Sequence, residues 1–422
     1  MFSLFKTRRN TKLYTKRLAI VIGFFHCFRL LTGAIAAIFF LNSGLALADL
    51  AILQMIFSCT TLIINYPVGI LCDKYGGKYF AYSACVIIAL FYLLCTFAPN
   101  LQMLMFAHFL NSIGLSFIGC AASTWIVSLA NAENHQTKNY LNYLGHLSGE
   151  IEAIGGVISG LLGALLVYSF NGQGYIYVFY ITSLLMFSLS FVVLSIPTSY
   201  TKKSVAETKK IVQMIKHNLN QIMHKREVMF FLLTSSAMVV LYQPIYHFWQ
   251  PYFAEFNIAK TYDVSMILGF CFALFSLAKY VFNNYVKGML LKNDNIDLMR
   301  MSIILTSLII PIFYCVAINS NSFILACILF CALHGCLSLI SRIIGGQYLK
   351  TTKEDSAASI MSLGEIMGRI LTISYFACLY KILPYISIKQ VFYISCIISL
   401  VILSGLLSWK KSIDNNILLY EN

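Results

Sequence analysis

Two ionisable side chains lie inside the first long apolar stretch of the chain. His26 and Arg29 are one helical turn apart, so a helix would place both on one face. A charged side chain at the centre of a membrane helix costs about 2.5 to 3.5 kcal/mol on insertion scales, which makes such residues functional candidates. A guanidinium beside an imidazole can bind a carboxylate or a phosphate. We therefore predict that Arg29 and His26 bind an anionic solute; a structural ion pair is the alternative for Arg29.

Carboxylates lie in two later apolar stretches. Glu150 and Glu152 occupy one of them, and in the other Glu365 precedes Arg369 by four residues. Side chains with that spacing meet on one helical face. A desolvated carboxylate near a base can carry a coupling proton. We predict proton coupling for Glu150 and Glu152, and a cytoplasmic gate for Glu365 and Arg369.

The elements that must position these residues are membrane helices. The chain has 422 residues, of which 59% are hydrophobic and 11% charged, against about 25% charged in soluble domains. A helix needs about 17 to 25 apolar residues to cross a bilayer. Twelve runs are long enough: 18–41, 49–70, 79–98, 101–129, 143–169, 174–196, 229–252, 263–285, 299–317, 322–345, 357–380 and 390–409. The predicted fold class is an all-α polytopic membrane protein.

Basic residues indicate how the chain crosses the membrane. If both termini are cytoplasmic, the cytoplasmic segments hold 23 of the 30 Lys and Arg residues, with Arg300 counted at the cytoplasmic end of the ninth run. The outer segments hold three and the helices hold four. This is the bias of the positive-inside rule. This bias accounts for the net charge of +14, so we predict no nucleic-acid partner. We predict a bacterial-type inner-membrane protein with cytoplasmic termini.

A short charged link joins the second and third apolar runs. It contains Gly69, Asp73, Gly76 and Lys78. Gly69 would allow close helix approach, Gly76 a tight turn, and Asp73 an interaction with a helix N-terminus or a base. With this spacing the segment resembles the signature between the second and third helices of the major facilitator superfamily, so we assign all four residues to gating.

The resemblance implies two pseudo-symmetric halves of six helices each. We place the halves at 1–196 and 229–422, with a basic amphipathic cytoplasmic linker at 197–228. An internal repeat agrees with this plan, because the eight residues from Leu144 and the eight from Leu363 share four identities at an offset of 219. In such transporters the substrate binds near the midplane between the repeats.

The resemblance also implies which helices line the central cavity, namely the first, fourth, seventh and tenth. Besides His26, these carry His108, His247 and His334, which we predict to bind substrate; a single hydrogen bond inside the bundle is the alternative for each. Pro244 and Pro251 would break the seventh helix, as in transporter binding sites. Trp249 between them is a further substrate-binding candidate, although aromatic residues also suit an interfacial belt.

The predicted function is secondary active transport of a small organic anion, such as an organic acid or a polycarboxylate, siderophore-like chelator, coupled to protons by alternating access. The expected partners are the substrate, protons and the bilayer, with a monomeric protein and no cofactor. Two motifs depart from those of drug exporters. His108 stands where many exporters have an arginine, and the fifth helix has an exporter-like glycine ladder without the proline: Gly155, Gly156, Gly160 and Gly163.

Three alternatives stay open. A multidrug exporter for lipophilic cations would bind its substrate through Glu150 or Glu152. A non-transporting membrane enzyme or receptor would need a nucleophile with its base, and the sequence offers none. Cys327, Cys331 and His334 could share a helical face and bind a soft metal, but we predict no metal site. Lys279 is expected to extend its charge toward the membrane surface.

Overall fold

The computed structural model is mostly helical in the part of the chain that it describes. This part comprises residues 2–97, 100–132, 137–170, 173–196, 242–258, 262–292, 314–351 and 357–398, with the isolated positions 236, 239, 307, 310–312, 400 and 404. The predicted linker at 197–228 lies outside these residues. Every regular element in the described part is a helix, which confirms the predicted fold class.

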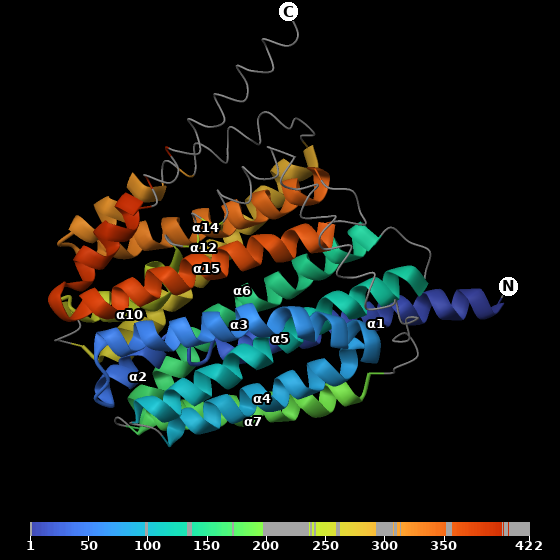
Figure 1. The fold of residues 1–422 in the computed structure, drawn as a ribbon, viewed down its shortest axis with the longest axis horizontal. Coiled ribbons are helices and arrows are strands. Elements are labelled where there is room, and N and C mark those ends of the chain that lie inside the picture. Colours follow the sequence, from blue (N-terminus) through green and yellow to red (C-terminus); the bar gives the residue numbers. More distant parts are fainter. Residues whose placement is uncertain are drawn as a thin grey trace, which may run out of the picture. The chain divides into compact units, whose positions relative to one another are not determined.

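The chain divides into two compact units, and the first comprises Met1–Val205 and Ala259–Leu277. Its helices follow one another with short connections (Figure 1). Their bounds are α1 Phe2–Arg29, α2 Ala36–Asn42, α3 Leu47–Tyr75, α4 Gly77–Thr96, α5 Leu101–Ala132, α6 Thr137–Ser169 and α7 Gly174–Leu194. The first part of α12 (Val264–Lys292) also belongs to this unit.

The second unit comprises Ala206–Ile258 and Ala278–Asn422. It contains α10 (Trp249–Ala254), the end of α12, α14 (Phe323–Thr351) and α15 (Ala357–Ile382), which a 3-10 turn extends at Leu383–Tyr385. Shorter apolar helices lie at Ile310–Asn319 and Ile388–Ile398. Each of the twelve predicted ranges therefore contains described helical residues.

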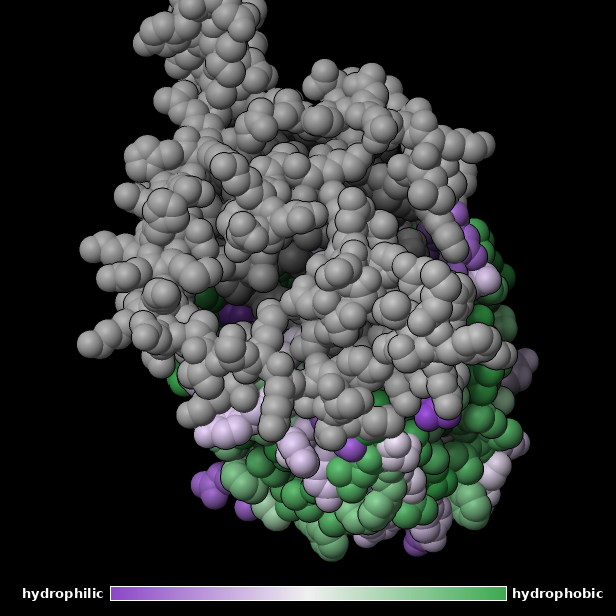
Figure 2. All heavy atoms as spheres, turned by 90° about the vertical axis from the view of Figure 1, so that its right-hand side faces the viewer, coloured by the Kyte–Doolittle hydropathy of each residue, from purple (hydrophilic) through white to green (hydrophobic). Residues whose placement is uncertain are grey.

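Apolar side chains cover the outside of these helices. Seven described helices are long and apolar enough to cross a membrane. On α6, the large side chains of Ile158, Leu161 and Leu165 are exposed, and hydrophobic residues cover much of the described surface in Figure 2. A soluble monomer rarely exposes apolar surface on this scale. The chain is thus an integral membrane protein whose helices face lipid.

The first predicted span is broken rather than continuous. α1 ends at Arg29, residues 30–35 form turns, and α2 begins at Ala36, so the prediction of one helix over 18–41 is wrong at this point. Two features explain the break. Thr32 Oγ1 donates to the carbonyl of Arg29 at 3.0 Å, and a Cβ on Gly33 would lie 2.8 Å from Cζ of Phe272 on α12.

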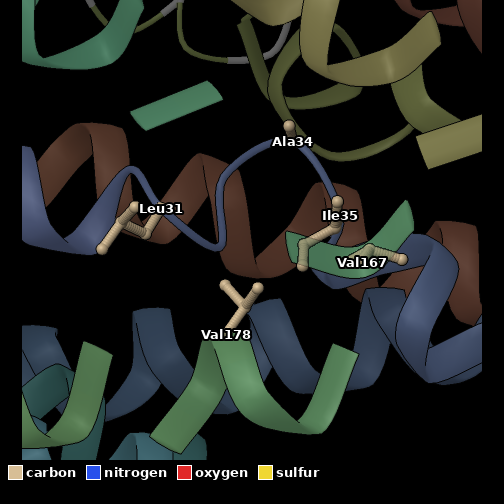
Figure 3. Packing of buried hydrophobic residues seen from close by; sticks show 5 residues of the cluster. All are labelled: Leu31, Ala34, Ile35, Val167 and Val178. Atoms are coloured by element: carbon tan, nitrogen blue, oxygen red, sulfur yellow. The ribbon is translucent and has the colours of Figure 1, made fainter. Parts of the chain in front are cut away.

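The broken segment is held by a small buried cluster. Leu31, Ala34 and Ile35 pack with Val167 of α6 and Val178 of α7. Figure 3 shows Ile35 beside Val167, with Val178 pointing up from α7 toward the segment. Inside a membrane such packing stabilises through van der Waals contact rather than through removal of apolar surface from water, and it holds the residues on either side of the break in place.

The glycine ladder of α6 brings two helices close to it. A Cβ on Gly155 would collide with Cys27, and a Cβ on Gly163 would collide with the carbonyl of Leu31. These two glycines therefore allow the first span to pack closely against α6. A Cβ on Gly156 would lie 2.6 Å from Ser276 Oγ, and a Cβ on Gly160 would lie 2.8 Å from Phe272 Cδ1. These two glycines allow α12 to pack closely against α6. Small residues at membrane helix interfaces permit such approaches.

Candidate functional site

The end of α1 places Arg29 at the break of the first span. Its carbonyl has lost its helical partner and accepts hydrogen bonds from Thr32 Oγ1 at 3.0 Å and from the hydroxyl of Tyr92 on α4 at 3.4 Å. Backbone groups at a helix end need such substitutes because water does not reach them inside the protein. Discontinuous helices of this kind line the binding sites of transporters.

The guanidinium of Arg29 has spare hydrogen-bonding capacity. Its Nε is buried and has no hydrogen-bond partner, and no carboxylate of the described residues forms an ion pair with it. A buried donor left unsatisfied is costly. An acceptor on a bound ligand would satisfy it.

His26 and Glu152 lie near Arg29. The charges of Glu152 and Arg29 both act on the His26 ring, and Glu152 also acts on Cys27 of α1. The close approach of α1 and α6 at Gly155 explains this proximity. The first unit thus brings together three of the predicted site residues: a cation, an imidazole and a carboxylate. Glu150 lies two positions earlier on α6, and helical geometry directs it to another side.

His108 lies in an aromatic environment on α5. Its ring is buried, with centroids 6.0 Å from Phe40 and 5.4 Å from Phe91, in edge-on arrangements. Its Nδ1 is 3.0 Å from the carbonyl oxygen of Leu104, one turn earlier. A hydrogen bond inside the bundle is the alternative to substrate binding for this residue; it occupies one ring nitrogen, and substrate binding by His108 stays a prediction.

The seventh span is broken between its two prolines, as predicted. Residues 242–247 are helical, Phe248 leaves the helical conformation at φ −113° and ψ 3°, and α10 begins at Trp249. Trp249 is buried, and the His247 ring centroid lies 5.7 Å from that of Phe376 on α15. Proline prevents a regular helical bond and clashes with the preceding turn.

His334 belongs to a second cluster of polar and aromatic side chains. Its buried ring meets Tyr246 of the seventh span edge-on at 5.4 Å. Above the same tyrosine, the ammonium of Lys279 lies 4.9 Å from the ring centroid. Lys279 was expected to extend its charge toward the membrane surface, and its contact with Tyr246 was not predicted. A lone base inside an apolar run was the signal that could have found it.

The structure confirms the tight turn predicted for the link between α3 and α4. Gly76 has φ +86°, a region that favours glycine, and it makes the tight turn. No described atom lies within 4 Å of a Cβ placed on Gly69, so the close approach expected there stays a prediction. Close approach occurs at Gly77 instead, where a Cβ would lie 2.5 Å from the carbonyl oxygen of Ala121.

Of the other predicted gate residues, the structure describes the side chains of Lys78 and Arg369. Lys78 is buried and donates from Nζ to the carbonyl of Leu194 at 2.7 Å. This contact places a cation at the C-terminus of α7, where the helix dipole is negative. The side chains of Asp73 and Glu365 lie outside the described residues. Arg369 is half-buried on α15.

Apolar helices around a charged cluster at a helix break are the features expected of an integral membrane transporter. The family model described as Major Facilitator Superfamily matches residues 18–370, so the chain belongs to that family of secondary transporters. No curated protein sequence matches the chain.

Solved structures share its fold. The nucleoside transporter NupG aligns with a TM-score of 0.71 and 14% identity, covering 94% of this chain and 98% of NupG. A bacterial homologue of the human lysosomal transporter Spinster, inward-facing and unoccupied, aligns with a TM-score of 0.70 and 11% identity, covering 94% of this chain and 96% of the homologue. These likenesses establish the fold and leave the substrate open.

Proposed function

We propose that this transporter carries a small organic anion, such as an organic acid or a polycarboxylate chelator, in exchange with or together with protons. The observation that carries the proposal is the Arg29 guanidinium, whose buried Nε has no hydrogen-bond partner at the break of the first span. A carboxylate or phosphate accepts two parallel bonds from a guanidinium. His26 supplies a second donor beside it.

The coupling proton is assigned to Glu152 together with His26. Glu152 is exposed on α6 and its charge acts on the His26 ring, so a proton on either group changes the charge near Arg29. Glu150, the other candidate, is half-buried on the same helix. We keep it as the alternative carrier, and the two are separable by substitution.

The second half contributes the other substrate contacts in this proposal. His247, Trp249 and His334 belong to the seventh and tenth spans, which line the cavity in this superfamily. His108, whose Nδ1 is bonded within α5, stays a predicted substrate contact of the first half. The gate comprises Gly76, Lys78, Asp73, Glu365 and Arg369. Both termini are cytoplasmic, the membrane is a bacterial-type inner membrane, and the protein works as a monomer.

Thermal unfolding of the purified protein tests the anion assignment. The probes are the dicarboxylate succinate, the monocarboxylate butyrate and the lipophilic cation tetraphenylphosphonium, at mildly acidic and at neutral pH. An anion at a hundredfold excess over its Kd adds about 2.7 kcal/mol to stability. We expect Arg29→Ala to lose this stabilisation while Arg17→Ala, an exposed arginine of the same helix, retains it. Unchanged anion stabilisation in Arg29→Ala would refute the proposal.

A cation exporter is the second candidate, because Glu152 places an exposed carboxylate beside the first span. In that case tetraphenylphosphonium alone would stabilise the protein, and Glu152→Gln would abolish the effect. Arg29→Ala would then leave ligand stabilisation intact.

A further inference from the structure

Two cysteines of the second unit lie in contact with each other. Cys315 belongs to the helix Ile310–Asn319, and Cys396 belongs to the helix Ile388–Ile398, 81 positions further along the chain. Their Sγ atoms are 3.3 Å apart, and both residues are free thiols. Two thiols that meet across different helices are the starting point for a disulfide bond between those helices.

The hydrogen bonds of the pair show where each thiol directs its proton. Cys396 Sγ donates to the carbonyl of Pro311 at 3.3 Å. Because a thiol has one proton, the hydrogen bond between the two sulfurs must be donated by Cys315. A lone pair of the Cys396 sulfur therefore points toward the Cys315 sulfur. This is the alignment that attack of one sulfur on the other requires.

Contacts on both sides of the thiols hold these two helices together. The hydroxyl of Tyr393 donates to Asn319 Oδ1, about one turn from the thiols on each helix. The ring centroids of Tyr314 and Phe392 lie 5.1 Å apart in an edge-on arrangement. A disulfide has an Sγ–Sγ distance of about 2.0 Å, so the two sulfurs need to approach by about 1.3 Å. Rotation of the two side chains can supply that movement while the helices stay in place.

The two thiols differ in how an oxidant can reach them. Cys315 is half-buried and lies one turn before Asn319, the exposed last residue of its helix, whereas Cys396 is buried. A small oxidant therefore meets the sulfur of Cys315 first. In the proposed orientation, this end of the helix faces the outside of the cell, where conditions are oxidising.

We propose that Cys315 and Cys396 form a redox-active pair that a peroxide converts to a disulfide. Hydrogen peroxide oxidises the Cys315 thiol to a sulfenic acid and releases one water. The Cys396 sulfur then attacks the Cys315 sulfur, the S–S bond forms, and the S–O bond breaks. The hydroxyl leaves with the Cys396 proton as a second water. Two thiols thus lose two electrons and two protons, and one peroxide becomes two waters.

The disulfide would tie the ninth span to the twelfth within the second unit. The closed loop of chain would contain both α14 and α15. Such a bond stabilises mainly by restricting the unfolded chain, and more so when the loop is long. We therefore expect the oxidised protein to unfold at a higher temperature than the reduced protein. This inference is independent of the transported substrate.

Oxidation of the purified full-length protein with hydrogen peroxide tests the pair. Catalase stops the reaction, and N-ethylmaleimide then labels the free thiols of the denatured protein for counting by mass spectrometry. We expect labels on all 13 cysteines of the reduced protein and two fewer after oxidation. Proteolysis of the oxidised protein should yield two fragments linked through Cys315 and Cys396, which dithiothreitol separates.

Two variants make the test specific. Cys315→Ser should give no linked fragments and no rise in unfolding temperature on oxidation. Cys378→Ser removes an exposed cysteine of the same unit and should still form the disulfide. If Cys315→Ser does not elute as a single folded species, Cys396→Ala takes its place with the same expectations.

Three results would overturn the proposal. The first is an unchanged number of labels after peroxide treatment. The second is the loss of labels without linked fragments, or with fragments that join other cysteines, because the two thiols would then not react with each other. The third is a disulfide that lowers the unfolding temperature, because the bond would then distort the helices that these contacts hold together.

Discussion

At the scale of single residues, two glycines near the link between α3 and α4 have opposite surroundings. Gly77→Ala would place a Cβ 2.5 Å from the backbone oxygen of Ala121, which cannot move without shifting α5. We expect a loss of about 1 to 3 kcal/mol in stability, as in overpacked cores. Gly69→Ala meets no described atom within 4 Å and should be neutral or stabilise α3 by up to about 1 kcal/mol.

Thermal unfolding of the two purified variants beside the wild type checks this pair. Because both changes add one methyl group in the same region of the chain, each is the control for the other. A Gly69→Ala variant that unfolds earlier than Gly77→Ala would contradict the assignment of close packing to Gly77.

The sequence predicted which charged residues lie within membrane spans, but it could not predict which side chains they contact. Arg29 and His26 became candidates because charge in an apolar run is costly, and the turn at Gly76 followed from the freedom of glycine. Lys279 was missed because its partner Tyr246 is 33 positions away in the sequence. Proximity of Glu152 to His26 likewise depends on how α6 packs on α1.

At the scale of elements, the break of the first span depends on hydrogen bonds that replace helical ones. Tyr92→Phe removes one of the two hydroxyls that donate to the Arg29 carbonyl. We expect a loss of about 0.5 to 1.5 kcal/mol, and a larger, non-additive loss when Thr32→Val removes the other donor as well. Tyr79→Phe, at an exposed tyrosine of α4, is the matched control.

Chemical or thermal unfolding of the single and double variants measures these losses, and anion binding shows whether Arg29 moves. If the double variant loses no more stability than Tyr92→Phe alone, the carbonyl does not depend on both donors. Restored helical bonding through residues 30–35 would give that result.

Sequence patterns predicted most elements well because lipid-facing helices must be long and apolar. The break of the seventh span was also predictable, since Pro244 and Pro251 mark it chemically. The break of the first span has no proline. Its cause is the Thr32 hydroxyl and the space that Gly33 gives to Phe272, and that space becomes evident only when α12 is placed against the first unit.

At the scale of the whole molecule, the internal repeat and the link predicted the family and a plan of two halves. No sequence pattern indicates that the start of α12 joins the N-terminal helices in one compact unit. Glycine on both sides explains that packing: a Cβ on Gly269 would lie 2.7 Å from the carbonyl oxygen of Gly160. Such backbone contact depends on matching positions of two helices, and neither run of sequence reveals it alone.

Coupling to a proton gradient is a property of the whole transporter, and Glu152 gives it a test. In proteoliposomes, the Glu152→Gln variant should still exchange, across the membrane, the anion that stabilises the protein against thermal unfolding, because Arg29 is unaltered. Accumulation driven by a pH gradient should fall at least about tenfold, since one group that carries the proton is gone. Glu150→Gln on the same helix is the control and should keep gradient-driven accumulation. The reverse pattern would assign the proton to Glu150, and full accumulation in both variants would mean that neither carboxylate couples transport to protons.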